Sequence, residues 1–266
     1  MSTFAPTPLA PHVGLAASAR QALVLTGRSL LRIKTNPEEL VGLTLLPVMF
    51  VLLFTYVFGT AIAGSTSAYL QFALPGIVVQ GVFFSTMYTG FGLHTDIAKG
   101  VFDRFRSLPI ARSGPLLGQI LADLFRYALG IALTLGFGML LGFRVHTGPL
   151  QALLAFAVLV GVAFAFSWAY TLLGLVARSP VIVQVAGTLV IFPLTFASSV
   201  FVPAHTLPGW LNAWSRFSPV TLLADTTRGL LLGGDVVHPG LGTLAWAVAI
   251  VAVFAPFSVR AYRRRV

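Results

Sequence analysis

The sequence predicts an all-α integral membrane protein with six transmembrane helices. Of its 266 residues, 57% are hydrophobic and 9% are charged, whereas a soluble domain has about 25% charged residues. So little charge cannot cover the water-facing surface of a protein of this size, which excludes an ordinary soluble enzyme and a disordered chain. The apolar residues also form continuous runs of about 20 residues, the length that a helix needs to cross the hydrocarbon core. In the strands of outer-membrane barrels, apolar and polar residues alternate instead.

Six such runs define the expected spans and the domain organisation. They cover residues 40–61, 72–94, 116–143, 150–176, 181–202 and 241–259. We expect residues 1–12 to be a disordered tail, residues 13–35 to be an amphipathic helix, and residues 36–266 to be one transmembrane domain.

The basic residues predict how the spans are oriented. The connections on one side of the predicted membrane carry 13 of the 17 Lys and Arg residues, and those on the other side carry 3. Because positively charged loops stay in the cytoplasm, both termini are expected there, in a multi-pass protein of the cytoplasmic membrane. The net charge of +10 would indicate nucleic acid in a soluble protein. In a membrane protein the positive charge is explained by basic cytoplasmic loops that lie next to anionic lipid, so we expect no nucleic-acid partner.

The stretch before the first span has an apolar helical face opposite a basic one. Its arginines are Arg20, Arg28 and Arg32. This pattern favours a helix that lies in the cytoplasmic interface, and a helix packed on a partner protein is the alternative. Asn36 and Pro37 then predict the start of the first span, as cap and first helical residue.

Two connections contain more than simple turns. The first part of the loop 96–112 predicts a short helix, ended by Pro109, with charge on one side and Val101, Phe102 and Phe105 on the other. Such a helix can fit a groove on a soluble partner, and a solvated basic loop is the alternative. Residues 203–239 contain four prolines and two tryptophans. They predict two helices too short to span, an external re-entrant or interfacial pair.

Few ionisable residues lie where chemistry would need them. Asp123 and Arg126 are three residues apart in the third span, so they can pair on one helical face; we favour a structural ion pair over a substrate contact. His94 and Asp96 could relay a proton, but a membrane-interface pair is favoured. His205 and His238 have no metal-ligand companions, and no cysteine is present, so no metal site is expected.

Motifs of known enzymes are absent from the sequence. Neither lysine follows the glycine-rich pattern of a P-loop, which cradles nucleotide phosphates. The sequence also lacks the His-Glu-x-x-His and Gly-x-Ser-x-Gly motifs of hydrolases. We therefore expect no catalytic residues, and energy for any transport must come from another subunit or from an ion gradient.

Four stretches, taken in order, resemble the permease of a type-two ATP-binding-cassette exporter, most closely the daunorubicin/doxorubicin-resistance membrane subunit family. They are Asn36-Pro37-Glu38-Glu39 with Pro47 and Tyr56-Val57-Phe58-Gly59; Tyr69-Leu70-Gln71-Phe72-Ala73-Leu74-Pro75-Gly76-Ile77; Asp103-Arg104-Phe105-Arg106-Ser107-Leu108-Pro109-Ile110 with Asp123 and Arg126; and Pro203 to Pro208 with Ser218-Pro219 and Asp225-Thr226-Thr227-Arg228-Gly229-Leu230. The resemblance extends over nearly the whole chain. Phe105 is a departure, because leucine is expected there.

The resemblance implies a homodimer of six-span units with two ATPase subunits on the cytoplasmic face. ATP and Mg²⁺ would be bound by those subunits, and this chain would hold no cofactor. Residues 13–35 would be the connecting helix, and the 96–109 loop would be the coupling helix that docks in the ATPase. The coupling residues would be Asp96, Lys99, Val101, Phe102, Asp103, Arg104, Phe105, Arg106, Leu108 and Pro109.

The resemblance also implies that the second and fifth spans line a pathway between the two copies. The substrate contacts would be Phe83, Phe84, Met87, Tyr88, Phe91, Phe192, Phe196 and Phe201. Apolar aromatic lining suits a hydrophobic or cationic planar molecule, so the implied function is export of a hydrophobic drug or antibiotic. Export of a lipid or polysaccharide precursor is the alternative, and a proton-driven transporter is a more distant one. Lipid-facing phenylalanines are the simpler explanation for any single residue.

Overall fold

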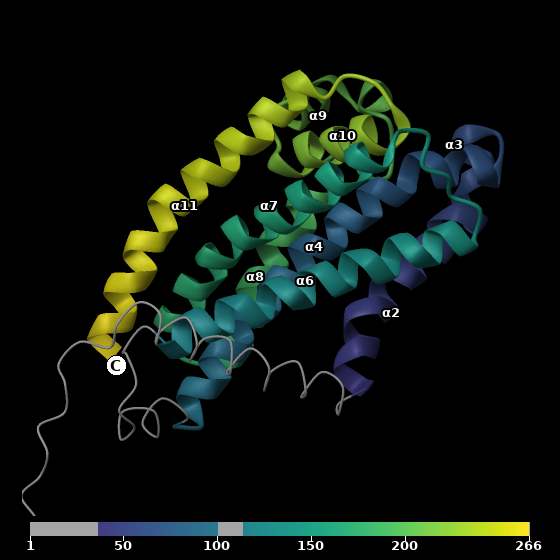
Figure 1. The fold of residues 1–266 in the computed structure, drawn as a ribbon. Helices are drawn as coiled ribbons and strands as arrows, with labels where there is room; N and C mark the ends of the chain where they lie inside the picture. Colours follow the sequence, from purple (N-terminus) through teal and green to yellow (C-terminus); the bar gives the residue numbers. More distant parts are fainter. Residues whose placement is uncertain (1–36, 101–113, 266) are drawn as a thin grey trace, which may run out of the picture.

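The described part of the chain consists of helices joined by short connections. The computed structural model describes residues 37–100 and 114–265, and in these ranges it contains no strand. The predicted tail, the predicted 13–35 helix and residues 101–109 of the predicted coupling helix lie outside them. The helices are α2 (Pro37–Leu53), the π-helix η1 (Phe54–Phe58), α3 (Gly59–Ala63), α4 (Thr66–Ala98), α6 (Gly114–Leu140), α7 (Pro149–Val176), α8 (Pro180–Phe196), the 3-10 turn η2 (Ala204–Thr206), α9 (Gly209–Ser215), α10 (Pro219–Leu232) and α11 (Val237–Arg265) (Figure 1).

Five helical stretches within these ranges are long and apolar enough to cross a membrane. They are Thr44–Ala63, Thr66–Ala98, Ala122–Leu140, Pro149–Val176 and Val237–Tyr262. They correspond to five of the six predicted runs, so the all-helical membrane class is confirmed. The fifth run differs from its prediction, because α8 has 17 residues and ends at Phe196 rather than near residue 202.

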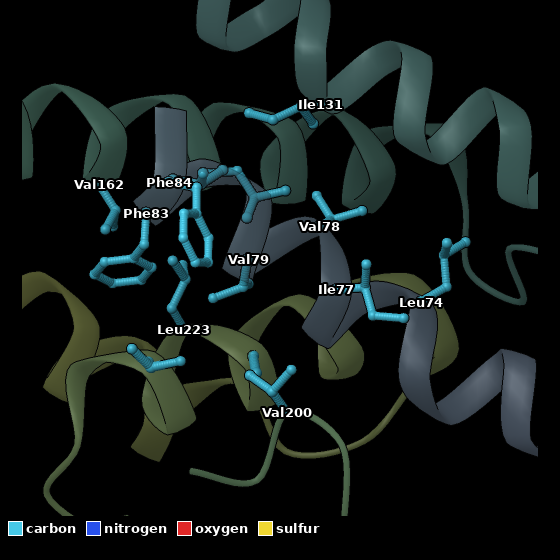
Figure 2. Close-up of a cluster of buried hydrophobic side chains, with 14 of the residues drawn as sticks. Leu74, Ile77, Val78, Val79, Phe83, Phe84, Ile131, Val162, Val200 and Leu223 are labelled. Carbon is cyan, nitrogen blue, oxygen red and sulfur yellow. The ribbon is translucent and has the colours of Figure 1, made fainter. Parts of the chain in front are cut away.

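Helix α4 is the central element of the fold. It contacts α2, α3, α6, α7, α8 and α10, while α11 packs on α7 and α10. Figure 2 shows Ile77, Val79 and Phe83 of α4 among apolar side chains from the elements around them. A helix that is apolar on all sides belongs in the interior, which explains why α4 is buried along most of its length.

Glycine allows α4 and α7 to approach backbone to backbone. A Cβ on Gly90 would lie 2.3 Å from the carbonyl oxygen of Tyr170, and one on Gly174 would lie 2.4 Å from the carbonyl oxygen of Gly90. No larger residue fits at either position without separating the helices. This crossing lies in the part of the molecule where α4, α7 and α11 end.

The long helices run between two ends of the molecule. Helices α9 and α10 lie at one end, called the α10 end, and α11 finishes at the other, called the C-terminal end (Figure 1). Helix α8 runs antiparallel to α4: Val183 lies against Gly90, whereas Val200, just beyond α8, lies against Gly76. Helix α8 and the turns after it therefore run along the part of α4 between Gly76 and Gly90.

Candidate functional site

Seven phenylalanines from three regions of the chain form one connected group, here called the aromatic cluster. Its members are Phe50, Phe54, Phe58, Phe84, Phe192, Phe196 and Phe201. Phe54 and Phe201 stack with ring centroids 4.1 Å apart and planes 17° from parallel. Phe192 and Phe196 stack at 5.5 Å and 18°. The cluster joins α2 and η1 to α8 through Phe201 and through the tilted contact between Phe50 and Phe196.

Helical spacing explains how the cluster forms. Phe50, Phe54 and Phe58 recur every fourth residue, as do Phe192 and Phe196, so each set lies on one helical face. Phe201 then bridges the two sets by contacting both Phe54 and Phe196. Phe58, Phe192 and Phe196 remain 41%, 42% and 44% exposed. The cluster therefore presents flat aromatic surface on the outside of a single chain.

The predicted substrate contacts fall into different environments. Phe84, Phe192, Phe196 and Phe201 belong to the aromatic cluster, and Tyr88 is 45% exposed. The other three do not join them: Phe83 is buried against Phe166 of α7 with centroids 4.5 Å apart, the Met87 sulfur accepts a hydrogen bond from Thr188 at 3.7 Å, and Phe91 is partly buried. Sequence analysis missed Phe50, Phe54 and Phe58, although their regular spacing was a usable signal.

The predicted coupling residues are described only at the end of α4. Asp96 is partly buried in the last turns of α4, and Lys99 follows the helix and is exposed. The remaining coupling residues and the arginines of the predicted 13–35 helix lie outside the described ranges. His94 is buried, and its Nδ1 lies 2.9 Å from the carbonyl oxygen of Gly174. Because a carbonyl only accepts, Nδ1 carries a proton, and α7 fixes the orientation of this ring.

Asp123 and Arg126 form an ion pair in the half of α6 nearer the C-terminal end. Arg126 Nη2 lies 2.7 Å from Asp123 Oδ1, and both side chains are largely buried. The same nitrogen donates to Thr89 Oγ1 of α4 at 3.3 Å. The Thr89 hydroxyl is also hydrogen-bonded to the Tyr127 hydroxyl. This polar network joins α6 to α4.

A second ion pair, which the sequence analysis did not single out, lies at the α10 end. Arg228 Nη1 is 2.8 Å from Asp225 Oδ1. Arg228 also donates from Nε to the Phe72 carbonyl oxygen at 3.0 Å, and from Nη2 to the carbonyl oxygens of Ser199 and Val200 at 2.8 and 3.0 Å. Its guanidinium carbon lies 4.0 Å from the centre of the Phe72 ring. One side chain thus connects α10, the first turns of α4 and the segment after α8.

Arg228 also provides partners for the backbone just after α8. Ser199 and Val200 follow Phe196, the last residue of the helix. Their carbonyl groups accept hydrogen bonds from the guanidinium. The Val200 carbonyl also occupies the space where a Cβ of Gly76 would be, at 2.6 Å. Burial lowers the pKa of the Arg228 guanidinium, and the neighbouring charge of Asp225 raises it again.

Metal-binding chemistry has no visible basis in this part of the chain. Within residues 37–100 and 114–265, no three His, Cys, Asp or Glu residues lie close enough to hold a metal ion. The arrangement instead offers an exposed aromatic surface and two ion pairs, one with both side chains largely buried and one with a buried arginine and a partly exposed acid.

Comparisons with known proteins identify the family. The ABC-2 type transporter family matches residues 20–232. The daunorubicin resistance ABC transporter permease protein DrrB1 of Streptomyces coeruleorubidus is 43% identical over 239 residues, which cover 90% of this chain and 84% of that protein. The probable doxorubicin resistance ABC transporter permease protein DrrC of Mycobacterium tuberculosis is 28% identical over 92% of this chain and 88% of its own length. The putative transport permease ycf38 of Cyanophora paradoxa is 25% identical over 79% of this chain and 74% of its own length. The chain therefore belongs to the ABC-2 type transporter family, as a multi-pass membrane permease.

Proposed function

We propose that this chain is the transmembrane subunit of an ATP-driven exporter that moves a hydrophobic drug or antibiotic out across the cytoplasmic membrane. Two copies would work with two copies of a separate ATPase subunit, which binds ATP and Mg²⁺. Membership of the family supports the division between permease and ATPase. The names of the relatives support the substrate class, because several of them are named for daunorubicin or doxorubicin resistance.

The aromatic cluster is the observation that carries the substrate proposal. Its exposed rings offer near-parallel faces to a flat apolar molecule. Stacking and cation–π contact favour planar hydrophobic molecules and cationic amphiphiles. In the exporter, ATP binding in the partner would tilt the helices and expose this surface alternately to the two sides.

We infer six membrane crossings, with both termini in the cytoplasm. Besides the five long helices, α8 and residues 197–202 would form the remaining crossing, supported by their antiparallel course along α4. The α10 end would then be external, with α9 and α10 as the re-entrant pair. The C-terminal end would face the ATPase.

The coupling proposal assigns the loop between α4 and α6 to ATPase docking, with the 13–35 helix beside it. Its support is that this loop follows α4 where α4 ends at the C-terminal end. Arg104→Glu should uncouple ATP hydrolysis from drug export while leaving the protein in the membrane. Arg144→Glu is the matched control, because it reverses an exposed arginine between α6 and α7 at the opposite end. Equal export by both variants would contradict the docking assignment.

The first test is a pull-down of the tagged protein from native membranes in mild detergent, with an ATPase assay on the eluate. We expect a P-loop subunit to co-purify and its activity to rise with a hydrophobic aromatic drug. A lone permease without ATPase activity would overturn the proposal.

A substitution pair tests the aromatic cluster itself. Phe196→Ala should change which drugs are exported, because Phe196 is exposed within the cluster. Phe257→Ala is the control, a 53% exposed phenylalanine on α11 that should leave the drug profile unchanged. Phe83→Ala should lower the amount of folded protein instead, because it empties a buried position, at about 3–5 kcal/mol. Identical drug profiles for Phe196→Ala and wild type would remove the cluster from the pathway.

The structure does not favour the lipid- or polysaccharide-precursor alternative. Such a substrate would need basic groups for its diphosphate, and the sequence offers Arg112 and Arg126 near the cytoplasmic entrance; Arg112 lies outside the described residues. Arg126 is paired with Asp123 at 2.7 Å, which neutralises its charge.

A further inference from the structure

An apolar groove lies between α8 and α9, on a different face of α8 from the aromatic cluster. Its volume is about 330 Å³, and its lining consists of Leu189, Val190, Pro193, Leu194, Ala197, Trp210, Leu211 and Trp214. None of these residues is charged. The groove is open, because Leu189, Val190 and Trp210 are 73%, 59% and 76% exposed.

With α8 as part of the remaining membrane crossing proposed above, this groove lies beside hydrocarbon rather than water. The helix has 17 residues, which span about 25 Å at 1.5 Å per residue, whereas the hydrocarbon core is ~30 Å thick. At the α10 end the helix therefore stops short, and α9 lies over its last turns. Tryptophan rings favour the level of the headgroups, which agrees with Trp210 and Trp214 at the rim.

A basic side chain lies at the end of α9, the helix that forms one side of the groove. Arg216 caps the end of α9, and its exposed side chain donates to Asn212 at 3.2 Å. These three features follow the order of groups in a phospholipid. The apolar groove matches the hydrocarbon chain, the aromatic rings match the ester region, and the arginine matches the phosphate. Cationic side chains near the membrane surface attract anionic headgroups.

We propose that the α8–α9 groove binds one hydrocarbon chain of an anionic phospholipid from the leaflet at the α10 end, with its headgroup at Arg216. The bound chain fills the space that the short helix leaves and holds α9 against α8. This site is separate from the aromatic cluster, and it rests on the proposed membrane crossing of α8 rather than on the export activity.

Tryptophan fluorescence tests the proposal directly, because the chain has four tryptophans and no cysteine. One reporter variant keeps Trp210 and Trp214 and carries phenylalanine at the other two positions. A second keeps only Trp246, which is 41% exposed on α11 and reports ordinary lipid contact. Both are placed in phosphatidylcholine nanodiscs with increasing amounts of phosphatidylglycerol brominated in its acyl chains, which quenches nearby indoles.

The groove reporter should reach half of its maximal quenching at a mole fraction of brominated phosphatidylglycerol about fivefold lower than the Trp246 reporter needs. This is the factor expected from one arginine near an anionic lipid. Arg216→Gln should abolish this difference. In the groove reporter, Val190→Phe should reduce maximal quenching by filling the groove. Val185→Phe should not, since Val185 is 61% exposed on the same helix but does not line the groove.

Other occupants give different results. If both reporters reach half-maximal quenching at the same mole fraction of brominated lipid, the groove makes ordinary lipid contact only, and the proposal is overturned. Weak quenching of the groove reporter together with disulfide formation between Val190→Cys chains would show a second copy in the groove, which also overturns it. Displacement of the quenching lipid by a transported drug at concentrations that saturate export would reassign the groove to the substrate.

Discussion

Asp123–Arg126 in α6 and Asp225–Arg228 in α10 are two ion pairs with the same spacing and different surroundings. Their nitrogen–oxygen distances are 2.7 and 2.8 Å. Arg126 reaches a hydroxyl group on α4, whereas Arg228 bonds to three backbone carbonyl groups from two other segments. The acids differ as well, because the side chain of Asp123 is 9% exposed and that of Asp225 is 43% exposed.

The comparison shows that spacing alone does not determine the role of an Asp–Arg pair. In α6 the acid is buried and the network cross-links two long helices. In α10 the arginine is the buried member and organises the backbone of a connection. We therefore expect removal of the arginine to lower stability more at the α10 end than in α6. Removal of the acid should lower stability more in α6 than at the α10 end.

Arg228→Ala should have the largest effect. Removing the guanidinium leaves three buried carbonyl groups without their donor, and loss of one member of a buried charged network costs about 3–5 kcal/mol. We expect a large fall in the thermal stability of the detergent-solubilised protein, measured by fluorescence-detected size exclusion. Arg228→Lys should recover little, because an ammonium group lacks the planar set of five donors. Wild-type stability of the alanine variant would show that the contacts at the α10 end are dispensable.

Asp123→Asn should come second. The substitution keeps the shape but removes the charge that faces Arg126, and hydrogen bonds to charged groups contribute about 1.5–3 kcal/mol. The same thermal assay measures it. A loss smaller than that of Asp225→Asn would invert the comparison between the two acids.

Gly76→Ala tests the backbone arrangement that Arg228 maintains. The new Cβ would lie 2.6 Å from the Val200 carbonyl oxygen and 3.1 Å from Arg228 Nη2. Overpacking of this kind costs about 1–3 kcal/mol, and it should be largely absent in an Arg228→Ala background. Gly92→Ala is the control on the same helix, because nothing lies within 4 Å of its added Cβ. Additive losses in the double variant would show that the two residues act independently.

Asp225→Asn should have the smallest effect, below about 1 kcal/mol, because exposed ion pairs contribute little. Arg228 keeps its three carbonyl partners in this variant. Measurement at low and high salt gives a second reading, since an exposed pair is screened. A loss as large as that of Arg228→Ala would show that the acid, rather than the backbone contacts, holds the arginine.

The parts of the fold that depend on local sequence were predictable. Continuous apolar runs predict membrane helices because an unpaired peptide group is too costly in hydrocarbon, and five of the predicted runs are long apolar helices in the structure. The spacing of Asp123 and Arg126 brings them together on any helix. The partner of the carbonyl groups after α8 was not predictable, because Arg228 lies some thirty residues further along the chain.

The sequence by itself determined the helical class of this protein, most of its apolar helices and its family, because hydrophobicity and short-range spacing act within one helix. Only the tertiary structure decided which aromatic residues meet, where α8 stops and which arginine is enclosed. Phe54 and Phe201 stack although they are far apart in the chain, and Phe83 turns toward α7 rather than toward Phe192. Those contacts depend on how the helices cross, and glycines such as Gly76 and Gly90 set the closest approaches.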